Sequence, residues 1–172
     1  MNRILKTAFF ALLLFALPAM ALCDAPVMLL ELPENAQMVE NVEFENGDFI
    51  QTYQLEGGVT VQLLRYSGFA MTMDELISSD WPVNCGVVVE EMEISGIAAQ
   101  HAHVYQAIDA EGYPVKADGK ESGVMEIDLV LVNTDDTALI VQSTMTSGGD
   151  AEAVAAILST LQVQGGENAE VG

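Results

Sequence analysis

The sequence has very little positive charge: five Lys and Arg residues stand against 26 Asp and Glu, a formal net charge of −21. After residue 21 the basic side chains are Arg65, Lys116 and Lys120 alone. Such a chain is repelled by nucleic acid and by anionic lipid, and it has no basic stripe to overcome that repulsion. We therefore expect no nucleic-acid partner. A solvated acidic surface, cation binding and adaptation to a salty medium all remain open explanations of the acid.

The sequence also lacks the short motifs of familiar enzymes. It has no G-x-S-x-G, no P-loop, no H-E-x-x-H and no C-x-x-C, which argues against common hydrolase, nucleotide-binding and thioredoxin-like chemistry. We therefore expect a non-catalytic protein. The two cysteines leave two hypotheses: a disulfide between Cys23 and Cys85 in an oxidising compartment, and a thiol enzyme that uses Cys85 with a histidine.

Long apolar runs are absent beyond the first residues. Arg3 and Lys6 precede an apolar run at 7–17, and Pro18 and an A-x-A cleavage pattern at 19–21 follow it. This arrangement predicts a secretory signal peptide over 1–21, and the run is shorter than the roughly 20 residues of a membrane span. We expect a periplasmic or secreted protein with no membrane span in the mature chain. Leu22 occupies the position where a lipoprotein signal has a small residue, so we expect no lipid anchor at Cys23.

What remains is a single predicted domain over 22–164, followed by a flexible tail over 165–172. Alternating or apolar patterns predict strands at 27–32, 42–44, 49–55, 59–63, 87–94, 97–108, 124–132 and 137–145. Asn46 and Gly47 predict a type I′ hairpin turn. Thr72 and Glu75 form a capping box that begins a short helix over 72–81, and an apolar stripe predicts a terminal helix over 150–163. The fold class is therefore α+β: an antiparallel sheet of about six to eight strands with a short middle helix and a C-terminal helix packed on it.

This order of elements resembles the PsbP-type fold, which is named for an extrinsic subunit of the photosynthetic oxygen-evolving complex and is shared by exported bacterial proteins of the DcrB family. The helix over 72–81, the turn at 94–98, the hairpin over 128–141 and the closing helix over 153–163 carry the resemblance, through glycine placement and element order. It implies an accessory or binding protein that works with another exported or envelope protein. No functional residue of those families has a matching motif here.

His101 and His103, the only histidines, form the sharpest local feature. Residues i and i+2 of a strand share a face, so two adjacent imidazoles could hold Zn²⁺, Cu²⁺ or Ni²⁺. A carboxylate, Cys85, Met71 or Met73 would supply a third ligand. The alternative is that the histidines lie on an exposed strand face or form hydrogen bonds in the core. Apart from Zn or Cu at this pair, we expect no cofactor.

Acidic clusters offer a further cation hypothesis. They are Asp109 with Glu111, Asp118 with Glu121, and Asp135 with Asp136. Carboxylate oxygens bind Ca²⁺, but none of these clusters has the spacing of an EF-hand loop, and Asp135 and Asp136 are typical turn residues. The partner and the oligomeric state stay open.

Overall fold

The computed structural model describes residues 25–80, 85–115, 119, 121–134, 136–146 and 149–165, with residues 79, 80, 85 and 146 described by their backbone alone. The predicted signal peptide, Cys23 and the predicted tail beyond residue 165 lie outside this part. The strands are β1 (Val27–Leu29), β2 (Gln37–Glu43), β3 (Phe49–Gln54), β4 (Val59–Ser67), β5 (Cys85–Ile94), β6 (Ile97–Ile108), β7 (Gly123–Thr134), β8 (Thr137–Thr146) and β9 (Gln162–Gln164). The helices are α1 (Met73–Asp80) and α2 (Ala151–Leu158), with a 3₁₀ turn η1 (Glu56–Gly58) between β3 and β4.

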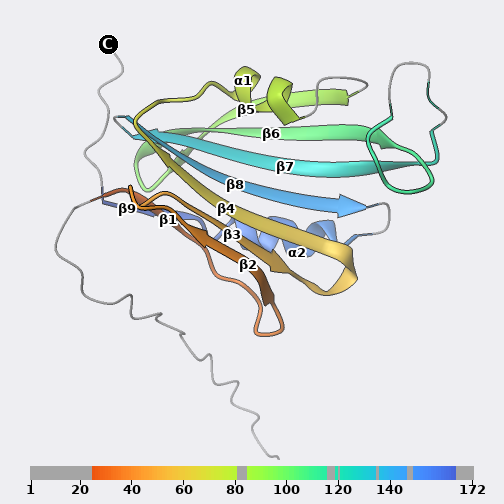
Figure 1. Ribbon diagram of the computed structural model, residues 1–172, viewed down its shortest axis with the longest axis horizontal. Coiled ribbons are helices and arrows are strands. Elements are labelled where there is room, and N and C mark those ends of the chain that lie inside the picture. The colour runs from red at the N-terminus through yellow and green to blue at the C-terminus, as the bar shows by residue number, and fades with distance from the viewer. Residues whose placement is uncertain are drawn as a thin grey trace, which may run out of the picture.

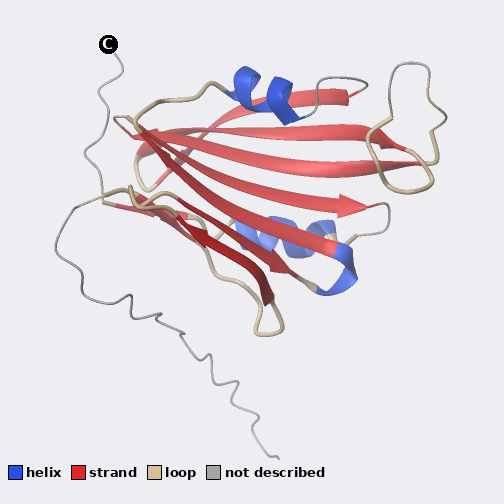
Figure 2. Cartoon of the chain, viewed as in Figure 1, coloured by secondary structure: helices blue, strands red, loops and turns tan. Residues whose placement is uncertain are grey.

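The main sheet has seven antiparallel strands in the order β2-β3-β4-β8-β7-β6-β5. A second, two-stranded sheet pairs β1 with β9 (Figure 1). Strand is the dominant secondary structure and the two helices are short (Figure 2). The fold is thus broadly α+β with an antiparallel sheet, as the sequence predicts. Neither helix in the described part has the length and apolar character of a membrane span.

The sheet buries both of its faces in the middle, because a helix packs on each side. One core joins Val154 and Ile157 of α2 to Val130 and Val141 of the central strands. The other core joins α1, including Leu76, to the alternate residues of the same strands. Central strands buried on both faces need continuous apolar sequence, which explains the run Leu129, Val130, Leu131 and Val132, all at most 2% exposed.

The capping box at the start of α1 is confirmed. The Glu75 N–H donates to Thr72 Oγ1 at 3.2 Å, and the Thr72 N–H donates back to Glu75 Oε2 at 2.9 Å. The bonds from the Thr72 backbone and hydroxyl favour the ionised acid and hold the pKa of Glu75 below its ordinary value. The Asn133 side chain ties the segment before α1 to β7, because it accepts from the Met71 N–H at 3.0 Å and donates to the Met71 carbonyl at 2.8 Å.

The C-terminal helix is shorter than predicted. Asp150 caps it by accepting from the Ala153 N–H at 3.0 Å, and it ends at Leu158. The prediction of helix through residue 163 was wrong, since Gln162–Gln164 forms β9 and pairs with β1. The apolar pattern after Leu158 is compatible with either structure. In the fold, Leu161 is buried at 9% exposure and the next residues pair as a strand. Tertiary pairing with β1 decides between the two.

The hairpin between β2 and β3 exists, but its turn differs from the predicted type I′ turn. The Gly47 N–H donates to the Phe44 carbonyl at 2.9 Å, which makes Glu45 and Asn46 the central residues. Gly47 has a φ of +84°, whereas Asn46 has no positive φ. This is a three-residue loop in which one glycine in the left-handed region follows the turn. The two-residue type I′ geometry occurs instead at Ser95 and Gly96, with φ of +54° and +82° between paired Ile94 and Ile97.

Candidate metal centre

Strand pairing brings the two histidines to a carboxylate that is distant in sequence. His101 and His103 lie on β6, and the register of β6 with β7 sets His103 directly opposite Asp128. His101 lies opposite Val130, one position along the same face. The three polar side chains therefore share the face of the sheet on which α2 packs, beside the apolar core that contains Val130.

The three side chains converge on one carboxylate oxygen. His101 Nε2 lies 3.0 Å from Asp128 Oδ1, and His103 Nδ1 lies within ion-pair distance of the same oxygen. The two imidazole rings are tilted against each other, with centroids 4.3 Å apart. The Asp128 side chain is 7% exposed, that of His101 18% and that of His103 41%. The cluster is thus anchored in the sheet on the Asp128 side and open to solvent on the His103 side.

The neighbouring strand holds the carboxylate in place. Ser143 of β8 pairs with Asp128, is 1% exposed, and donates its hydroxyl to Asp128 Oδ2 at 3.5 Å. This long contact engages the oxygen that faces away from the histidines, so Oδ1 stays directed at them. In metal sites, hydrogen-bond partners of this kind orient the side chains that coordinate the ion.

The arrangement offers one ligand atom from each of three residues, all within 4.8 Å of one another. A tetrahedral zinc site with ligand bonds near 2.05 Å separates its ligand atoms by about 3.3 Å. The present separations from Asp128 Oδ1, 3.0 Å to His101 Nε2 and 2.5 Å to His103 Nδ1, are shorter, so both imidazoles would have to move outward to admit an ion. Without an ion, the same geometry is a buried carboxylate that accepts hydrogen bonds from two imidazoles.

The structure brings a carboxylate, one of the predicted classes of third ligand, beside the two histidines. Sequence reasoning did not single out Asp128. Its signal was a lone charge inside the apolar run of 127–132. The suggestion of Met71 or Met73 was wrong, because both pack in the core on the α1 side of the sheet, with Val104, whereas the histidines occupy the other face.

Both cysteine hypotheses concern side chains that lie outside the described part of the chain. The Cys85 backbone pairs with Gln106 of β6, but its side chain, like the whole of Cys23, lies outside the described part of the chain. The disulfide and the thiol enzyme therefore stay predictions.

The acidic clusters show turn chemistry where they are described. Asp109 Oδ1 accepts from the Glu111 N–H at 3.0 Å and from the Tyr113 N–H at 2.9 Å, which closes the loop after β6. Asp118 and Asp135 lie outside the described residues. Among the side chains that the structure places, His101, His103 and Asp128 alone form a group of three or more potential ligands close enough to share an ion.

Comparisons with known proteins show no family for this chain. No family model matches it, and no curated protein matches it either. Among solved structures it is similar to a crystal structure from Bacteroides thetaiotaomicron VPI-5482, with 15% sequence identity and a TM-score of 0.46. The match covers 80% of this chain but 45% of the other, so this chain spans about half of that protein. A likeness at this level carries no argument about function.

Proposed function

We propose that this protein is an exported, non-catalytic binding protein that holds a divalent transition-metal ion, Zn²⁺ or Cu²⁺, through His101, His103 and Asp128. The observation that carries the proposal is the convergence of two imidazole nitrogens and one carboxylate oxygen within 4.8 Å. Imidazole is a preferred ligand of zinc and copper, and carboxylate oxygen completes many zinc sites.

Burial and charge both support the proposal. Asp128 is a carboxylate on a central strand, 5% exposed as a residue, and a buried carboxylate is costly unless a cation or strong donors compensate it. A bound divalent ion supplies that compensation. The exposed side of His103 leaves room for a water or another ligand to complete the coordination shell.

Non-catalytic binding agrees with the absence of a recognisable catalytic motif in the sequence. The PsbP-type resemblance implies a partner protein in the same compartment. The bound ion would then either help that partner to dock or be delivered to it. The acidic surface would raise the local concentration of cations around the site.

Calorimetric titration of the processed protein with Zn²⁺ and with Cu²⁺ tests the proposal. We expect one ion per chain with a dissociation constant of about 1 µM or tighter. The His101→Ala/His103→Ala double variant should lose this binding, and Asp128→Asn should weaken it at least about tenfold. Glu93→Gln is the matched control, because it removes an exposed carboxylate from β5 on the opposite face of the sheet.

The outcomes separate a site from a diffuse acidic surface. If the wild-type protein and the three variants bind the metal ions equally, scattered carboxylates hold the ions and the histidines are structural. If the wild-type protein shows no binding at about 100 µM metal, the cluster is a hydrogen-bonded arrangement within the fold. Loss of binding in Glu93→Gln as well would likewise contradict the assignment.

A further inference from the structure

The two edges of the main sheet differ in a way that points to an interaction surface. The edge strands are β2 and β5. The pairing of β2 with its neighbour is interrupted by a register shift between Met38 and Glu40, and such irregularities protect an edge from further pairing. By contrast, β5 pairs with β6 without a break from Cys85 to Ile94. Its outer side therefore offers a long, regular row of backbone donors and acceptors.

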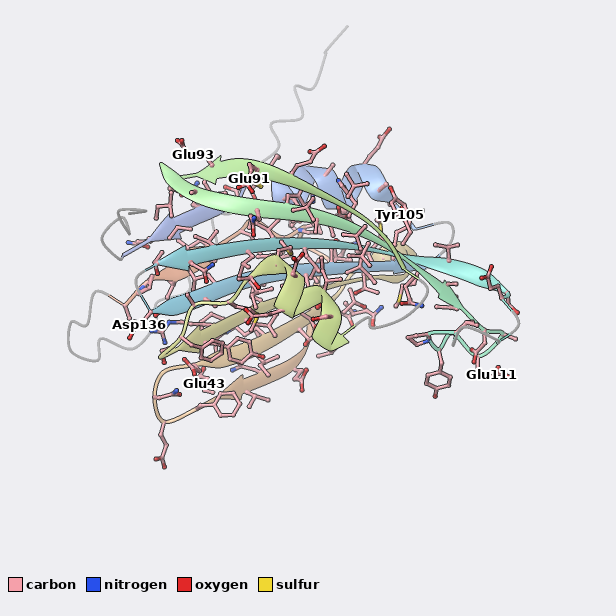
Figure 3. The ribbon with its side chains drawn as sticks, turned by 90° about the horizontal axis from the view of Figure 1, so that it is seen from above. Glu43, Glu91, Glu93, Tyr105, Glu111 and Asp136 are labelled. Carbon is pink, nitrogen blue, oxygen red and sulfur yellow. The ribbon has the colours of Figure 1, made fainter. Side chains whose placement is uncertain are left out.

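The first half of this regular edge is also apolar. Val87, Val88 and Val89 are 40%, 52% and 43% exposed. Because the three residues are consecutive, apolar surface lies on both faces of the strand. Exposed β-branched residues on a long, regularly paired edge are what proteins normally avoid unless another strand covers them. Glu90 follows this apolar segment directly, and Figure 3 shows Glu91 and Glu93 along the β5 border of the sheet, away from Glu43 of β2.

We propose that β5 is a self-association surface, where a second copy of this chain adds its own β5 in antiparallel orientation around a two-fold axis at Val88. This register places Val88 opposite its own counterpart and Val87 opposite Val89 of the other copy. Glu90 then faces Gly86, and Glu91 faces the position of Cys85, so no carboxylate lies directly opposite another. Like charges directly opposite each other destabilise a sheet, and a two-fold interface must be self-complementary.

The same register creates a polar contact on each side of the axis. Tyr105 of β6 pairs with Gly86 of β5 and is 46% exposed. Glu90 of the second copy falls in the same row, two strand spacings or about 9.6 Å from Tyr105. Gly86 has no side chain to fill that gap, so the phenol can extend across it and donate to the carboxylate. The symmetry repeats this charge-assisted hydrogen bond.

Charge decides how the association should respond to salt. The full sequence has a formal net charge of −21, and processing would remove Arg3 and Lys6 from it. Two copies therefore repel one another, and added salt screens that repulsion. Self-association should therefore tighten as salt rises. A basic extended segment of another protein is the alternative occupant of this edge. The acidic chain would attract it, and it would bind more weakly as salt rises. The inference does not depend on the proposed metal site.

Analytical ultracentrifugation of the processed protein tests the inference. Pairing of single edge strands buries little area, so we expect a dimer with a dissociation constant of roughly 10 to 100 µM. It should tighten severalfold between about 0.05 and 0.5 M NaCl. Val88→Lys should weaken the dimer at least about tenfold, although it lowers the net negative charge, because two lysines would then face each other.

Two further variants make the result specific. Val39→Lys makes the same change on β2, where Val39 is 58% exposed, and should leave the dimer unchanged. Tyr105→Phe should weaken it about tenfold, because two hydrogen bonds to carboxylates are lost. A monomer at about 1 mM protein in high salt overturns the inference. The inference is also overturned if Val39→Lys weakens the dimer as much as Val88→Lys does, or if the dimer dissociates when salt is added.

Discussion

Replacing Arg65 with methionine should destabilise the protein by about 3 kcal/mol, mainly through lost bonds to backbone carbonyls. Arg65 is the single Lys or Arg among the described residues and is 7% exposed. Its Nε donates to the Pro26 carbonyl at 3.1 Å and its Nη1 to the Gly47 carbonyl at 2.7 Å. Nη1 also lies 3.7 Å from Asp48 Oδ1, which is too long for a hydrogen bond.

The carboxylate of Asp48 has other partners. Its Oδ1 accepts from the Ser67 N–H at 2.8 Å and the Ser67 hydroxyl at 2.7 Å, and its Oδ2 accepts from Asn46 Nδ2 at 2.7 Å. Burial raises the pKa of Asp48, but the bonds from Ser67 and Asn46, with the charge of Arg65, outweigh this and leave the pKa below its ordinary value.

The magnitude follows from these distances. Two hydrogen bonds from a charged donor contribute about 1.5 kcal/mol each at the lower end of their range. Methionine keeps much of the aliphatic packing of arginine, so a cavity adds little. Because three hydrogen bonds still stabilise the Asp48 carboxylate, loss of the cation should add about 1 kcal/mol or less.

Urea unfolding followed by circular dichroism measures the effect through a double-mutant cycle of Arg65→Met, Asp48→Asn and the double variant. We expect a coupling free energy of about 1 kcal/mol or less and a fall in melting temperature of roughly 6 to 12 °C for Arg65→Met. A coupling free energy above about 2 kcal/mol would show that the ion pair dominates and refute this reasoning.

Three further predictions concern pH and local structure. Because the folded pKa of Asp48 is lowered, its contribution to the free energy of unfolding is present above the unfolded pKa of about 3.9 and is lost as pH falls through the folded value. Asp48→Asn should therefore flatten the loss of stability measured between about pH 5 and 2. Parallel curves of stability against pH for the variant and the wild-type protein would contradict this. Asn133→Ala removes both hydrogen bonds to the Met71 backbone and should lower the free energy of unfolding by about 2 kcal/mol. Relative to the wild-type protein, hydrogen exchange should accelerate more in α1 than in α2, and an equal change in both helices would show that Asn133 does not hold α1 to β7. Thr72→Ala should lower stability by about 1 kcal/mol in urea unfolding, and an unchanged midpoint would mean that the capping box does not stabilise α1.

Short-range features were the ones that the sequence could predict. The strand over 97–108 matches β6, and the capping box at Thr72 is present. Both depend on residues within one turn or one strand, where alternation or a single hydrogen bond decides the outcome. The placement of His101 and His103 on one face follows from the same alternation. Where two local patterns competed, as at 159–164, the sequence could not separate helix from strand.

The signal peptide, the export compartment, the cysteine pairing and the PsbP-type resemblance stay predictions, since they depend on undescribed residues or on relatives that were not found. The α+β class with an antiparallel sheet is confirmed in its broad form.

By itself, the sequence determined that two imidazoles lie side by side on a strand, because a two-residue repeat is a property of any extended chain. Only the tertiary structure decided that Asp128 joins them, since a 14-residue connection between β6 and β7 does not dictate which residues pair across it. The tertiary structure also decided that β5 lies at an edge. Strand order depends on which faces the helices cover, and that choice is made by packing across the whole domain.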